Sequence, residues 1–165
     1  MNLQYADHFE QERQWLEPLL RERIPLAGTM DLRVCRLDAR GIELAFPLAP
    51  SVNDKGTAFG GALASAMILA GWALPRLLLQ RHQIQADLVI GRCELRFIAP
   101  VQDAYSACCD WPEPPALETF LAEIRERGKG RLDLGAEIRA NGQLAASLQA
   151  RYAALLPPGA EGNHP

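Results

Sequence analysis

The feature that most constrains the fold is a polar, glycine-bearing loop that runs directly into a segment without a polar face. The loop covers residues 53–57 and the segment covers 58–74, where Ser65 and Trp72 carry the only polar side-chain atoms. A helix that is apolar all round belongs in a protein core or in a membrane. Pro75 interrupts the run before it reaches the ~20 residues of a bilayer span. The pattern therefore predicts a buried helix packed closely against a sheet that wraps it.

Length, charge and cysteine content narrow the class of protein. With 165 residues, 48% of them hydrophobic, we expect one globular domain over residues 1–156 and a disordered Pro- and Gly-rich tail over 157–165. The net charge of −3 argues against a nucleic-acid partner. The four cysteines lack metal-ligand spacing, so no metal site is expected. The first ten residues lack a signal-peptide pattern, which predicts a cytoplasmic protein and no membrane attachment.

Hydrophobic periodicity and turn residues predict the order of the elements. We expect helices over 6–23, 58–80 and 116–127, and strands over 30–35, 42–46, 86–98, 104–110, 131–140 and 143–152. The Asn141-Gly142 pair predicts a tight hairpin turn, because it supplies the positive φ angles of a type I′ turn. Hairpin-connected strands imply an antiparallel sheet. The predicted class is α+β, with the sheet wrapped around the long central helix, an N-terminal helix, and a helical insert at 116–127 that caps a pocket or covers a sheet edge.

The loop and the start of the central helix carry a resemblance to a known family. Asn53-x-x-Gly56-x-x-Phe59-Gly60-Gly61 resembles the Asn-x-x-Gly-x-x-His-Gly-Gly signature of hotdog-fold acyl-coenzyme A thioesterases of the PaaI type. Residues 53–72, together with the Glu-Leu-Arg-Phe-Ile-Ala-Pro stretch at 94–100, are similar to a narrower group of thioesterases that includes the C-terminal domain of YiiD-type acetyltransferase fusions. The resemblance implies a hotdog fold and hydrolysis of acyl-coenzyme A or acyl-carrier-protein thioesters. It also implies a homodimer, or a dimer of dimers, with the site at the dimer interface.

The resemblance also implies roles for three residues of the loop and helix start. The N–H of Gly60, with Gly61 as its neighbour, would polarise the thioester carbonyl, as helix N-termini do for developing negative charge. Asn53 would orient the attacking water. Two structural readings stand beside these roles: the glycines let helix and sheet pack closely, and Asn53 caps a turn.

The remaining candidates bind substrate or supply a base. Asp54 is the first candidate for the base, although an aspartate near a helix start is also common for dipole reasons alone. The substrate-binding candidates are Lys55, Gly56, Thr57, Phe59, Gly61 and Ser65. The Ser65 hydroxyl either reaches the substrate or bonds back to a carbonyl one turn earlier. The basic segment 125–131 is either a solvated helix end or a phosphate contact for a cofactor or a carrier protein. Cys93 is interpreted as a packing residue on strand 86–98.

Two departures from the family pattern bear on catalysis. Phe59 replaces the family histidine, and Ile68 replaces the acidic residue nine positions later. No Asp or Glu occurs between Lys55 and Ala86, so the central helix offers no carboxylate base. Asp87 and Glu94 on the next strand, from this or a partner subunit, are the remaining acids.

These departures keep two alternative functions open. One is a non-catalytic acyl-coenzyme A binding or sensing module, and the other is a hotdog dehydratase or hydratase, for which His82 is poorly placed. No cofactor is expected beyond the coenzyme A moiety of the substrate.

Overall fold

The computed structural model describes residues 3–158, with side chains from residue 8 onward. The elements are α1 (Leu3–Arg23), α2 (Pro25–Thr29), β1 (Arg33–Leu37), β2 (Gly41–Phe46), the 3-10 turn η1 (Ala49–Ser51), α3 (Gly60–Arg81), β3 (Asp87–Phe97), β4 (Tyr105–Asp110), α4 (Pro114–Arg127), β5 (Lys129–Ala140) and β6 (Gln143–Leu155). The tail that the sequence predicts to be disordered begins at residue 157, and its residues 159–165 lie outside the described part.

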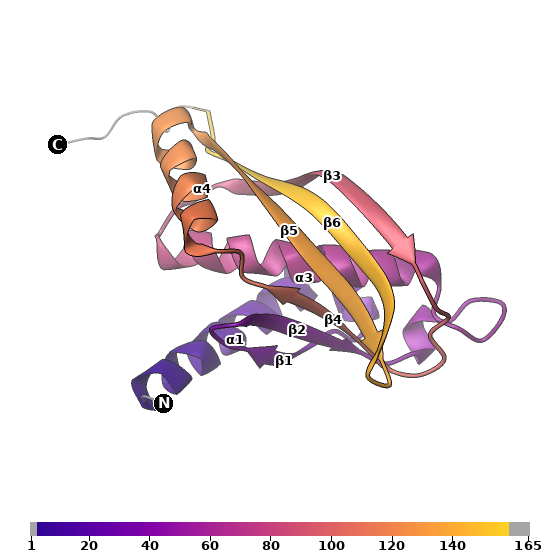
Figure 1. The fold of residues 1–165 in the computed structure, drawn as a ribbon. Coiled ribbons are helices and arrows are strands. Elements are labelled where there is room, and N and C mark those ends of the chain that lie inside the picture. Colours follow the sequence, from indigo (N-terminus) through magenta and orange to yellow (C-terminus); the bar gives the residue numbers. More distant parts are fainter. Residues whose placement is uncertain (1–2, 159–165) are drawn as a thin grey trace.

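The sheet is antiparallel and curves around α3, as the sequence predicts (Figure 1). The strand order is β1-β2-β4-β5-β6-β3, so β1 and β3 form the edges. Asn141 and Gly142 have φ angles of 50° and 75°, which confirms the tight turn between β5 and β6. Inward-facing apolar side chains of the sheet and the apolar surface of α3 together form the core.

The central helix α3 is longer than the uninterrupted apolar run, because it continues through Pro75 to Arg81. By length and composition alone it could cross a membrane, but 67% of its most apolar window is buried inside the molecule. The buried helix that the sequence predicts is therefore confirmed. At Gly71 the helix lies so close to β6 that an added Cβ would sit 2.4 Å from the Tyr152 hydroxyl oxygen. That hydroxyl donates a hydrogen bond of 2.9 Å to the Ile68 carbonyl of α3.

Two helices differ from the pattern in the sequence. Pro25 begins the short helix α2, because proline fits the first helical turn, where its missing N–H is not needed. Helix α4 starts at Pro114 for the same reason, two residues before the predicted start. It packs over the beginning of β5, where an added Cβ at Gly130 would lie 2.5 Å from the Phe120 carbonyl oxygen.

The side chains of strand β3 do not pack as its alternation suggests. Its exposed apolar side chains include Val89 at 44% and Phe97 at 57% relative exposure, and Cys93 is exposed as well. The interpretation of Cys93 as a packing residue is therefore wrong for this chain alone. The strand pairs with β6 along one side, and within residues 3–158 no strand pairs with its other side.

Candidate functional site

The loop that precedes α3 is held together by the side chain of Asn53. Its Oδ1 accepts hydrogen bonds from the backbone N–H groups of Lys55 (2.9 Å) and Thr57 (3.1 Å), and its Nδ2 donates to Thr57 Oγ1 at 2.9 Å. Gly56 has a φ of +75°, a conformation that favours glycine. In this structure Asn53 thus caps the turn and fixes the shape of the loop.

Three hydrogen bonds fix the two ends of this loop, and a buried one of them ties the loop to the sheet. Ser51 is 4% exposed, and its Oγ lies 2.9 Å from the Tyr105 hydroxyl oxygen on β4. Burial raises the pKa of Tyr105 although the Ser51 hydrogen bond opposes this rise, so the hydroxyl stays neutral. The Ser51 carbonyl accepts the N–H of Phe59 at 2.6 Å, and the Val101 carbonyl accepts the N–H of Ala58 at 2.8 Å. The start of α3 is therefore fixed in position.

Two glycines with free N–H groups form the N-terminus of α3. Within the described residues, no acceptor is bonded to the N–H of Gly60 or of Gly61, which are the orphan donors of the first helical turn. A Cβ at Gly60 would lie 3.6 Å from the Phe97 ring, and one at Gly61 would meet the Phe59 ring. Both rings are exposed, at 57% and 59%. The helix dipole and these donors together favour an anionic oxygen at this helix N-terminus, close to two exposed apolar rings.

The other residues predicted for the site lie around this helix N-terminus without joining it. Asp54 and Lys55 are exposed, and their side chains have no polar partner among the described residues. The Ser65 hydroxyl donates to the Gly61 carbonyl at 2.8 Å, which is the bond back to the preceding turn.

The other candidates for a catalytic acid or base are Asp87, Glu94 and His82, and they differ in how far they lie from the N-terminus of α3. Asp87 and Phe97 are the two ends of β3, roughly 33 Å apart in an extended strand. His82 follows the opposite end of α3 from the glycines. Glu94 lies three residues before Phe97. Two segments of the chain meet at Gly60: the loop before it and the Phe97 end of β3. Asp54 is the carboxylate nearest to Gly60 along the loop, and Glu94 is the one nearest to Phe97 along the strand.

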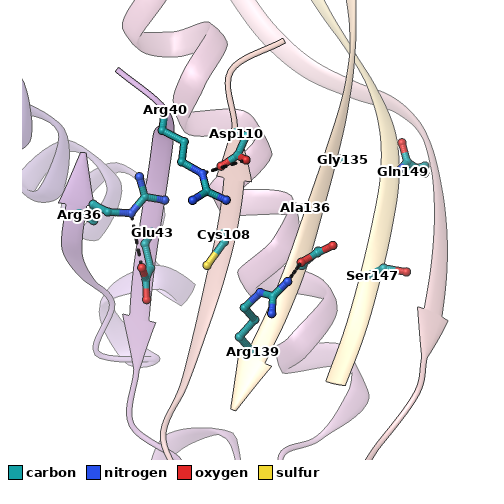
Figure 2. Close-up of a pocket in the computed structure, with 11 residues that line it drawn as sticks. Arg36, Arg40, Glu43, Cys108, Asp110, Gly135, Ala136, Arg139, Ser147 and Gln149 are labelled. Atoms are coloured by element: carbon teal, nitrogen blue, oxygen red, sulfur yellow. Dashed lines mark hydrogen bonds and ion pairs between the residues drawn. The ribbon is translucent and has the colours of Figure 1, made fainter. Parts of the chain in front are cut away.

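A cavity of about 510 Å³ lies on the outer face of the sheet, and the charged side chains that line it stand on that face (Figure 2). Carboxylates pair with each of its arginines: Arg36 with Asp38 and Glu43, Arg40 with Asp110, and Arg139 with Glu137. The charges in this cavity therefore compensate one another. Burial, followed by the nearby Glu43 carboxylate, raises the pKa of the Cys108 thiol to about 11, so this thiol is not an activated nucleophile.

The sequence analysis missed some of the residues that form the candidate site at the N-terminus of α3. Phe97 lies in the 94–100 stretch that carries the resemblance, and only the fold shows that its ring approaches Gly60. Ser51 and Tyr105 gave no signal, because a buried serine and a strand tyrosine have no distinctive spacing.

Comparisons with known proteins agree with this geometry. The family model described as "Putative thioesterase (yiiD_Cterm)" matches residues 13–156. No curated protein sequence matches the chain. A solved protein of unknown function from Chlorobaculum tepidum TLS is 28% identical, with a TM-score of 0.85 over 90% of this chain and 97% of that one.

Two further solved structures share the fold. A putative thioesterase from Shewanella oneidensis is 24% identical, with a TM-score of 0.76 over 90% of this chain and 99% of that one. The probable thioesterase PA5026 from Pseudomonas aeruginosa is 22% identical, with a TM-score of 0.74 over 86% and 94%. The antiparallel sheet around a long central helix in this chain is thus the hotdog fold of these thioesterases.

Proposed function

Because this chain belongs to the family of YiiD C-terminal-domain thioesterases, we propose that it hydrolyses acyl thioesters of coenzyme A or of an acyl-carrier protein. The observation that carries the proposal is the pair of free N–H groups at the start of α3, at Gly60 and Gly61, close to the exposed rings of Phe59 and Phe97. Hydrolysis of a thioester needs donors where negative charge develops and an apolar surface for the acyl chain.

The proposed reaction begins when water attacks the thioester carbonyl carbon. The N–H of Gly60 stabilises the negative charge that forms on the carbonyl oxygen. The C–S bond then breaks, the thiolate leaves and takes up a proton, and a carboxylic acid remains. Asn53 fixes the loop that leads to these donors, and Asp54 is the candidate that takes the proton of the attacking water. No cofactor is needed for these steps.

A second copy of the chain completes this proposed site. The free edge of β3 carries exposed apolar side chains and unpaired backbone groups, which is the pattern that favours strand pairing with another chain. Pairing β3 with β3 of a second copy would join the two sheets and bring a partner surface to the exposed Phe97 ring. The homodimer, or a dimer of dimers, is therefore part of the proposal. The four free thiols suit a cytoplasmic setting.

One observation favours a second candidate function. No Asp or Glu lies on α3, so no carboxylate faces the acyl pocket from the helix that forms it. A chain that kept the pocket and lost the base would bind acyl-coenzyme A without hydrolysing it, and would serve as a binding or sensing module.

The release of free thiol from acyl-coenzyme A thioesters of increasing chain length separates these two functions. We expect turnover by the native protein and a loss of roughly 10²–10⁴-fold in Asp54→Ala if Asp54 is the base. Asn53→Ala should lose activity through disorder of the loop. Glu126→Ala, on the exposed side of α4, is the control and should match the native protein. Coenzyme A binding without turnover at any chain length would refute the hydrolase and support the binding module.

A further inference from the structure

The far end of α3 borders a second cavity, of about 560 Å³, that the proposed chemistry does not use. Its lining residues are Arg76, Gln80, Gln83, Ile84, Gln85, Ala86, Asp87 and Pro157. Its lining comes from the last turns of α3, the loop that follows and the start of β3, whereas Gly60 and Gly61 begin α3 at its other end. The lining is mostly polar, and several of its members carry side-chain amides that donate hydrogen bonds.

Arg76 is the unusual member of this cavity. The other half-buried arginines, Arg13, Arg21 and Arg36, each form an ion pair with a carboxylate. Arg76 has no carboxylate partner among the described residues, and its guanidinium lies over the Trp15 ring, 5.6 Å from the centroid. Burial lowers its pKa, as expected for a cation held without a counter-charge. Asp87 lines the same cavity but is exposed and forms no ion pair with Arg76.

The surroundings of the cavity are also basic. Leu156, next to Pro157, donates its N–H to the Gly128 carbonyl at 2.8 Å. Arg125 Nη2 lies 3.4 Å from His82 Nδ1, next to Gln83. The cavity thus borders the basic segment 125–131, whose cations raise the local positive potential. Carbonyl oxygens at the end of α3 accept hydrogen bonds from the N–H groups of residues 82–84. These oxygens are therefore already paired within the chain.

We propose that the Arg76 cavity binds a phosphate group of the thioester carrier. A guanidinium presents a planar fork of N–H donors that matches a phosphate, and the amides of Gln80, Gln83 and Gln85 add further donors. The anion from the ligand supplies the counter-charge that Arg76 lacks in the chain. This inference rests on the proposed function for the identity of the ligand, because the phosphate belongs to coenzyme A or to the phosphopantetheine arm of a carrier protein.

In the proposed dimer, the Arg76 cavity of one copy belongs to the same substrate-binding site as the helix N-terminus of the other copy. In a two-fold interface, antiparallel pairing of β3 sets the Asp87 end of one strand beside the Phe97 end of its partner. The Arg76 cavity of one copy then lies on the side of the partner's helix N-terminus. One copy holds the phosphate while the other holds the thioester carbonyl, so the extended pantetheine arm crosses between them.

Calorimetric titration of coenzyme A and of pantetheine, which has no phosphate, tests the cavity without any turnover. Arg76→Gln should weaken binding of coenzyme A by roughly tenfold to a hundredfold, and leave pantetheine binding unchanged. Gln85→Ala, in an exposed loop, should weaken coenzyme A binding several-fold with the fold intact. Arg40→Gln is the matched control, because it removes the same charge from the outer face of the sheet. Equal coenzyme A affinity in Arg76→Gln and the native protein, or an equal loss in Arg40→Gln, would overturn the proposal.

Kinetics with two carriers identify which phosphate is bound. A higher KM of Arg76→Gln for both acyl-coenzyme A and acyl-carrier protein assigns the pantetheine phosphate, and a rise for acyl-coenzyme A alone assigns the nucleotide phosphates. Failure of the native protein to turn over any thioester would refute hydrolysis and leave the calorimetric result standing. Turnover by the native protein, with an unchanged KM in Arg76→Gln, would support hydrolysis and overturn the assignment of the phosphate to the Arg76 cavity.

Discussion

Gly60 occupies the first helical position of α3, where the backbone N–H has no partner in the described chain. Proline is tolerated at that position, and the preceding Phe59 has an extended conformation (φ −64°, ψ 136°) that suits a following proline. Gly60→Pro therefore deletes the proposed donor without breaking a helical hydrogen bond. We expect kcat for thioester hydrolysis to fall by roughly 10²–10³-fold.

Gly60→Ala is the matched control for this substitution. It adds a methyl group at an ordinary contact distance of 3.6 Å from the Phe97 ring and keeps the N–H. Its kcat should stay within a few-fold of the native value, and thermal unfolding should show both variants folded. Similar kcat values in Gly60→Pro and the native protein would remove Gly60 from the mechanism.

The two neighbouring thiols of β4 give a second expectation for single residues. Burial, followed by Glu43, raises the pKa of Cys108 to about 11, and burial, followed by Asp110, raises that of Cys109 to about 12. Both thiols are therefore protonated at pH 8, and alkylation requires the thiolate. Mass spectrometry after iodoacetamide treatment should show slow modification of both up to pH 9 and a rising rate for Cys108 above pH 10. Fast modification at pH 7.5 would contradict these shifts.

The contact between helix α3 and strand β6 depends on the absence of a side chain at Gly71. An alanine would bring its Cβ to 2.4 Å from the Tyr152 hydroxyl oxygen, inside the core. Helix propensity favours Gly→Ala by about 1 kcal/mol, but overpacking costs about 1–3 kcal/mol. We expect Gly71→Ala to lower the free energy of unfolding in urea, whereas Gly60→Ala, on the same helix, should not. A stabilised Gly71→Ala would show that Tyr152 moves aside at little cost.

The sequence predicted these elements well where local patterns decide them. The apolar run of α3 and the Asn141-Gly142 turn are confirmed because each carries its own signal: a missing polar face and two positive φ angles. The exposure of β3 could not be predicted, because alternation along a strand does not say whether a partner covers it. The loop residues were singled out from the resemblance, but the bonds of Asn53 depend on the turn geometry. Arg76 was not predicted, because a missing counter-charge is visible only in three dimensions.

Strand β3 forms one edge of the sheet, and we propose that this edge is the dimer interface. Val89→Lys places a charge on an exposed apolar position of this edge, where desolvation on pairing would be costly. We expect the variant to sediment as a monomer and to lose turnover together with dimerisation. Leu26→Lys, a 52% exposed apolar position on α2, is the control and should remain dimeric and active. A native protein that sediments as a monomer at micromolar concentration would refute the interface.

The strand order has a consequence for how the chain is made on the ribosome. Strand β3 follows α3 directly, yet its neighbour in the sheet is β6, which is synthesised after β4, α4 and β5. At translation rates of about 5–20 residues per second, the intervening stretch takes several seconds to emerge. During that interval the most apolar helix of the chain has no complete sheet around it. Until β6 emerges, β3 has no partner strand and part of the apolar surface of α3 stays uncovered, so the core is completed only by the last strand to be synthesised.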